Sequence, residues 1–137
     1  MPFRNLFLTT LALSACADPD PMDRGGSPYN EIATNAAIMA TGAEPGAERA
    51  WVLKINPEIA GKHMARFSHP DKPEDRVFAL TRFAGNNGLG FSGEVDGQAV
   101  QVAITPGDCR DGASERDYDF TATVSVGRAT LLGCAST

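Results

Sequence analysis

The stretch LGFSGEVDGQAVQVAIT, residues 89–105, decides the fold class of this chain. At its centre stands Asp96-Gly97, a two-residue turn flanked by alternating apolar residues, which is the strongest short-range signal for a β-hairpin. Pairing Val95 with Gln98 sets the other pairs of the register: Phe91 with Val102, Leu89 with Ile104, and Gly93 with Val100. All of these positions fall on one face, so the turn and the hydrophobic pattern agree.

A second hairpin is expected downstream, where DFTATVSV (119–126) and ATLLGCA (129–135) flank Gly127-Arg128. A glycine followed by another residue suits a two-residue hairpin turn. The resulting register pairs Val124 with Leu131 and Val126 with Ala129. It also places Cys134 on the opposite face, near Thr121.

Further strand-like runs lie upstream. They are AWVLKIN (50–56), KHMARFSH (62–69), RVFALTRF (76–83) and IATNAAIMATG (32–42), the last of which also suits a short helix. The first run alternates and is bounded by Pro57 and Gly61, and its pattern favours Trp51 in the core over a role as a ligand platform. Strands and turns at this spacing predict an all-β fold, a small antiparallel barrel or sandwich of about six to eight strands.

Length and charge restrict the function. The chain has 137 residues, enough for one domain, and 42% of them are hydrophobic. Its formal net charge is −5, and its Lys and Arg residues form no run. Nucleic-acid binding requires clustered cations, so no nucleic-acid partner is expected.

The first residues are typical of an export signal. One basic residue, Arg4, precedes a short apolar run, and Leu13-Ser14-Ala15-Cys16 resembles the lipobox of bacterial lipoproteins, in which cleavage precedes a lipid-bearing cysteine. The alternative is ordinary cleavage, because Ala15-Cys16-Ala17 also fits a small-x-small site. We therefore expect a signal peptide over 1–15 and a lipidated Cys16, carrying acyl chains such as palmitate, on a flexible tether over 16–30. A single β domain is expected over 31–137.

The residue after the lipidated cysteine predicts the destination. Ala17 stands where an inner-membrane retention signal has Asp. The expected location is the bacterial cell envelope, in the inner leaflet of the outer membrane, with the domain facing the periplasm. The lipid anchor makes the membrane itself the first partner.

The two remaining cysteines, Cys109 and Cys134, are most simply a disulfide in an exported protein. A metal pair or free thiols are the alternatives. A metal would need further ligands, and the only two histidines, His63 and His69, do not adjoin a cysteine in sequence. No metal or other cofactor is expected.

No catalytic constellation is visible in the sequence. His63 and His69 are expected to be exposed structural residues. GNNGLG (85–90) lacks the Gly-Lys-Ser/Thr ending of a phosphate loop and is interpreted as a turn.

The segment CRDGASERDYDF (109–120) is the candidate binding loop. Asp111 and Ser114 can accept backbone N–H groups, and Arg116 can pair with Asp117, so the loop can satisfy its own polar groups. The alternative is a recognition surface, since rigid polar loops on β scaffolds often bind. In that case Asp111, Ser114, Arg116 and Tyr118 are the candidate contacts.

The same segment carries a resemblance to uncharacterised envelope lipoproteins of proteobacteria, whose signature runs Cys-x-Asp-Gly-Met-Ser-Asp-Arg-x-Tyr and later Gly-Cys-Ala. The matching residues here are Cys109, Asp111, Gly112, Ser114, Arg116, Tyr118, Gly133, Cys134 and Ala135. Ala113 and Glu115 depart from the pattern. Upstream, GAERAW (46–51) is similar to the family's Gly-Thr-Glu-Pro-Phe-Trp at Gly46, Glu48 and Trp51, while Arg49 and Ala50 depart from it. The resemblance implies a small β domain in the envelope and no assigned reaction.

These observations predict a lipid-anchored binding or structural module whose partner is an envelope protein or a small ligand. One alternative is an inhibitor of a hydrolase such as lysozyme, by analogy with other small disulfide-containing periplasmic lipoproteins. Another is a small enzyme that uses His63 or His69 as its base.

Overall fold

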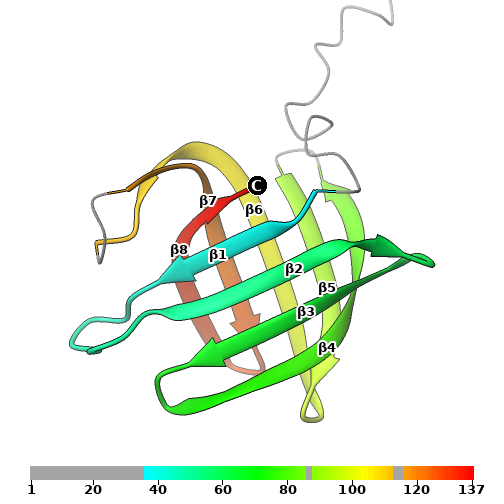
Figure 1. Ribbon diagram of the computed structural model, residues 1–137, viewed down its shortest axis with the longest axis horizontal. Coiled ribbons are helices and arrows are strands. Elements are labelled where there is room, and N and C mark those ends of the chain that lie inside the picture. Colours follow the sequence, from blue (N-terminus) through cyan, green and yellow to red (C-terminus); the bar gives the residue numbers. More distant parts are fainter. Residues whose placement is uncertain (1–35, 86–87, 113–115) are drawn as a thin grey trace, which may run out of the picture.

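A computed structural model describes residues 36–85, 88–112 and 116–137. Eight antiparallel strands each pair with the next, and β8 pairs back with β1 to close a barrel (Figure 1). The strands are β1 (Ile38–Gly42), β2 (Trp51–Ile59), β3 (Lys62–His69), β4 (Lys72–Gly85), β5 (Gly88–Val95), β6 (Gln98–Arg110), β7 (Asp117–Val126) and β8 (Ala129–Ser136). No helix in these ranges is long and apolar enough to cross a membrane. The predicted all-β class is confirmed, and of the two predicted architectures the barrel is the one formed.

Both predicted hairpins form in the predicted register. β5 and β6 pair Val95 with Gln98 and continue through the other predicted pairs to Leu89 with Ile104. Asp96 and Gly97 have φ values of 52° and 75°, and positive φ at both central residues is the signature of the type I′ turn that Asp-Gly favours. In the β7–β8 pair, Val124 lies opposite Leu131 as expected.

Two strands run further than predicted. Pro57 does not end β2, because the pairing with β3 shifts register between Ile55 and Glu58. A bulge at this point accommodates a residue without an N–H donor, so the strand continues past it. β6 likewise extends to Arg110 through a register shift between Pro106 and Cys109. The prediction that Pro57 bounds its strand was therefore wrong.

The core fills the barrel with alternate side chains from all eight strands. Trp51 is 1% exposed, which confirms its predicted place in the core. Its indole packs against two glycines, since a Cβ added at Gly42 or Gly133 would come within 3 Å of indole carbon Cζ2. Trp51 is the largest side chain in the core. It therefore requires glycine at the neighbouring positions of β1 and β8.

The predicted disulfide between Cys109 and Cys134 is present, with a Cα–Cα distance of 5.6 Å. Cys109 lies next to the last residue of β6 and Cys134 belongs to β8, and β7 lies between these two strands. The cross-link therefore joins strands that are not hydrogen-bonded neighbours. Cys134 is fully buried, although its neighbour Leu132 on the same face of β8 is exposed.

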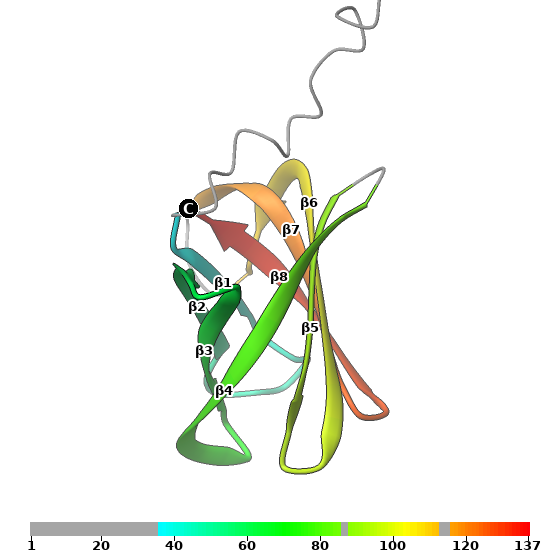
Figure 2. The ribbon, with the colours of Figure 1, turned by 90° about the vertical axis from the view of Figure 1, so that its right-hand side faces the viewer.

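The barrel has two different ends. The β3–β4, β5–β6 and β7–β8 turns, together with the loop between β1 and β2, lie at one end, which we name the turn end (Figure 2). The start of β1, the β6–β7 connection and the C terminus lie at the opposite end, named the entry end. The described chain therefore enters and leaves the barrel at the same end.

Candidate functional site

The described part of the predicted binding loop lies at the entry end and is internally bonded. The Tyr118 hydroxyl donates to Asp111 Oδ2 at 3.2 Å, and the Arg116 guanidinium carbon lies 5.8 Å from the centroid of the Tyr118 ring. Ser114 lies outside the described residues. Three of the four candidate contacts are thus brought together, because Asp111 and Arg116 each lie against Tyr118.

The ion pair of this loop differs from the predicted one. Asp117 pairs with Arg110, at 2.9 Å from Nε to Oδ1, and not with Arg116. Both side chains of the pair are largely exposed, so the pair adds little to stability. Arg110 and Asp117 also lie opposite each other in the β6–β7 register. The ion pair therefore joins the last residue of β6 to the first residue of β7.

The residues that carry the family resemblance meet in the fold. Gly133 lies against Trp51, Cys134 is bonded to Cys109, and Tyr118, itself buried, bonds to Asp111 on the same connection. These interactions pack the core and fasten the entry end.

A second candidate site is an open cleft of about 370 Å³ at the turn end. Its walls come from the β1–β2 loop and from β3, β4, β6, β7 and β8, so it spans the mouth of the barrel. The lining residues are Glu44, Phe67, His69, Asp71, Lys72, Arg76, Gln98, Val126, Arg128, Ala129 and Leu131. Phe67 and Leu131 are buried core residues and form an apolar floor beneath a charged rim.

Three cations line this cleft: Lys72, Arg76 and Arg128. The guanidinium of Arg76 lies 4.9 Å above the Phe67 ring, and its NH1 group is 3.4 Å from Asp96 Oδ2. Its side chain is only 16% exposed, and its Nε finds no hydrogen-bond partner among the described residues. Arg76 is therefore held in place by stacking while part of its donor capacity stays unused.

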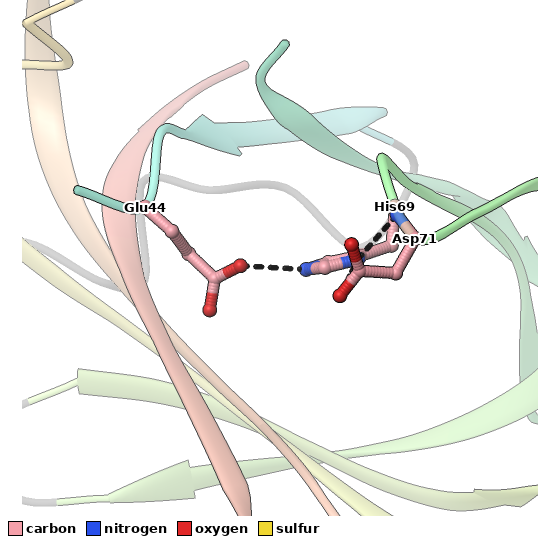
Figure 3. A network of polar contacts seen from close by, with 3 residues as sticks. All are labelled: Glu44, His69 and Asp71. Carbon is pink, nitrogen blue, oxygen red and sulfur yellow. Dashed lines mark hydrogen bonds and ion pairs between the residues drawn. The ribbon is translucent and has the colours of Figure 1, made fainter. Parts of the chain in front are cut away.

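His69 lies between the two carboxylates of the cleft (Figure 3). The backbone N–H of Asp71 donates to Nδ1 at 3.1 Å, and Nε2 lies 3.0 Å from Glu44 Oε2. Because an amide N–H can only donate, Nδ1 of the neutral ring is the acceptor and Nε2 carries the proton that Glu44 accepts. Both ring nitrogens are thus occupied, and the ring ties the β1–β2 loop to the β3–β4 turn.

The expectation that both histidines are exposed was wrong. His63 is 3% exposed, with its ring edge-on to Phe91 at 5.2 Å and Nδ1 donating to the Asn56 carbonyl at 2.9 Å. Its inward place follows from strand alternation, which puts it on the same face as Ala65 and Phe67. The side chain of His69 is 14% exposed. Neither ring offers an unoccupied nitrogen to solvent, an arrangement that does not favour either histidine as a general base.

The turn-end cleft was missed because its residues are far apart in the sequence. Lys72, Arg76 and Arg128 carry no local motif, and only closure of the barrel brings β4 beside β8 across the mouth. One signal was available: in an antiparallel meander, every second turn falls at the same end. The turns at Asp71, Asp96 and Arg128 therefore belong together.

The chain was compared with known proteins at three levels. Neither the protein-family models, nor the curated proteins, nor the solved structures contain a match to it. The function is accordingly argued from the geometry of the barrel itself.

Proposed function

We propose that this protein is a lipid-anchored lipoprotein of the bacterial envelope whose β-barrel binds a small ligand at its turn end, facing the periplasm. The observation that carries the proposal is the cleft of about 370 Å³ with a buried apolar floor and a charged rim. Concave sites of a few hundred Å³ that combine apolar walls with a few polar groups are typical of small-ligand binding.

The direction of the cleft supports the same proposal. β1 begins at Ile38, which pairs with Ile55 at the middle of β2, whereas Gly42 pairs with Trp51 close to the β1–β2 loop. A tether leading back to Cys16 joins the barrel at the entry end, opposite the cleft. An anchor of this kind leaves the cleft facing away from the membrane and accessible to solutes.

The anchor is tested by metabolic labelling with radioactive palmitate. The wild-type protein is expected to take up label and to stay with the membrane fraction. The Cys16→Ser protein is expected to lose both, because serine offers no thiol for the acyl glyceryl group. A Cys109→Ser protein is the control and should label like the wild type. Equal labelling of wild type and Cys16→Ser would remove the anchor from the proposal.

Ligand binding is tested by closing the cleft. Ala129 lines the cleft and is exposed, so we expect Ala129→Trp to fill part of the space above the Leu131 floor. Binding of the neutral fluorescent probe N-phenyl-1-naphthylamine to the unacylated Cys16→Ser chain is expected to weaken about tenfold or more, since the probe loses its apolar contact area.

The matched control is Ala99→Trp, which adds the same side chain at an exposed position on β6 outside the cleft. It should leave probe affinity unchanged. If both tryptophan variants bind the probe as the wild type does, or if the wild type does not bind it, the cleft is not a ligand site.

A further inference from the structure

We infer that the ligand of the turn-end cleft is a small amphiphilic anion, whose apolar body lies on the Phe67–Leu131 floor and whose carboxylate, phosphate or sulfonate group meets Lys72 and Arg128. This inference rests on the proposed function and adds the chemical class of the ligand. Three features of the cleft carry it: the distribution of its ion pairs, the state of Arg76, and the depth of its floor.

Two of the carboxylates around the cleft have partners in the protein. Glu44 accepts a hydrogen bond from His69, and Asp96 lies opposite Arg76. Asp71 is 88% exposed, and the His69 Nδ1 atom 3.8 Å from its carboxylate already accepts the Asp71 backbone N–H and offers it no proton. In the part of the chain that the structure describes, neither Lys72 nor Arg128 forms an ion pair. Three cations and two carboxylates line the cleft, so with His69 neutral its lining carries a formal charge of +1.

Arg76 adds a fixed donor group whose Nε–H is not used within the described residues. Its guanidinium is fixed by stacking on Phe67, and the Nε–H has no acceptor within the described ranges. A poorly exposed donor without an acceptor costs free energy, which an anionic ligand nearby offsets through the charge of the guanidinium. A planar cation stacked on an aromatic ring is also pre-organised, so little side-chain entropy is lost when a ligand binds.

The floor and the volume of the cleft indicate the size and the apolar part of the ligand. Phe67 is 2% exposed and Leu131 is 4% exposed, so both side chains belong to the packed core. A ligand in the cleft would touch only their edges. A volume of about 370 Å³ lies at the small end of ligand sites. The cleft therefore suits one compact apolar group carrying one charged group, and not a polymer.

Two fluorescent probes separate the anion from the apolar body. 1-Anilinonaphthalene-8-sulfonate and N-phenyl-1-naphthylamine share the same aromatic frame, and only the first carries a sulfonate. Both are titrated into the unacylated Cys16→Ser chain, alone and combined with Lys72→Gln and Arg128→Gln. The control combines Lys54→Gln and Lys62→Gln, two exposed lysines outside the cleft, and so removes the same formal charge.

The wild-type cleft is expected to bind the sulfonate about tenfold more tightly than the neutral probe. Loss of Lys72 and Arg128 should weaken sulfonate binding about fivefold, as for two partly exposed ion pairs, and leave the neutral probe within about twofold. The control pair should change neither affinity. Added salt should reduce the preference for the sulfonate.

The contrary results are distinct from one another. Equal affinities for the two probes would show that the cleft binds a ligand without a preference for anions. An equal loss of sulfonate binding in the control pair would assign the preference to overall charge and overturn the site at Lys72 and Arg128. Failure of both probes to bind would overturn the proposed function along with this inference.

Discussion

Replacing Gly133 with alanine is expected to lower the free energy of unfolding by about 3 kcal/mol. A Cβ at this position would lie 2.2 Å from the carbonyl oxygen of Thr41 and 2.7 Å from Cζ2 of Trp51. The first is backbone of the neighbouring strand β1, and the second belongs to a fully buried ring, so neither can move aside without disturbing the barrel. Urea unfolding followed by the fluorescence of Trp51, the only tryptophan, measures the effect.

Gly90→Ala is the matched control for this change. Its added Cβ would also meet an atom at 2.3 Å, but all three nearest atoms belong to the ring of Phe83, which is 52% exposed. An exposed side chain can change rotamer, so the cost should stay below about 1 kcal/mol. If the two alanines destabilise equally, close packing against β1 and Trp51 is not the reason for Gly133.

Removal of the disulfide in the Cys109→Ala, Cys134→Ala protein is expected to cost about 3.5 kcal/mol of stability. The two cysteines are 25 residues apart, and the chain-entropy model gives this value for a closed loop of that length. The loss is a large share of the roughly 5–15 kcal/mol that stabilises a small domain. Urea unfolding with and without dithiothreitol measures it.

Reductant serves as the internal control for the cross-link. Dithiothreitol should destabilise the wild type by a similar amount and leave the double-alanine protein unchanged. A double variant within about 1 kcal/mol of the oxidised wild type would contradict the view that the bond acts by restricting the unfolded chain.

Local rules predicted the hairpins well. Asp96-Gly97 fixed both the turn and the register of β5 and β6 because the turn type and the side-chain alternation demand the same pairing. The disulfide was predictable because the sequence predicts export, and two spare cysteines in an exported chain most simply pair. The hairpin register depends only on residues that are close in sequence, and the disulfide depends only on the small number of cysteines.

The predictions that failed either used residue type alone or needed contacts between strands that are distant in sequence. Pro57 ends a strand by local rules, but a bulge in its pairing with β3 carries the strand onward. His63 was expected at the surface from its residue type, yet alternation along β3 turns it inward against Phe91. The cations of the turn-end cleft come from different hairpins, so no local window contains them.

The same distinction applies to the loop resemblance. Cys109, Tyr118 and Gly133 all belong to the pattern that carries the resemblance, and Tyr118 was also a candidate binding contact. In the barrel they meet Cys134, Asp111 and Trp51, and each contact is one of packing or cross-linking. These three residues thus hold the fold together, while the proposed ligand site lies at the other end of the barrel.

The position of β1 has a mechanical consequence. β1 is hydrogen-bonded to β2 along its whole length and to β8 over Met39–Thr41, and it begins at the entry end, where the tether of the proposed lipoprotein would join it. Tension from such a tether acts along the strand axis, which loads these hydrogen bonds in shear and requires them to break together. Peeling would break them one at a time and at lower force. The short first strand would therefore resist pulling in the proposed lipoprotein, whose barrel is held by its N terminus.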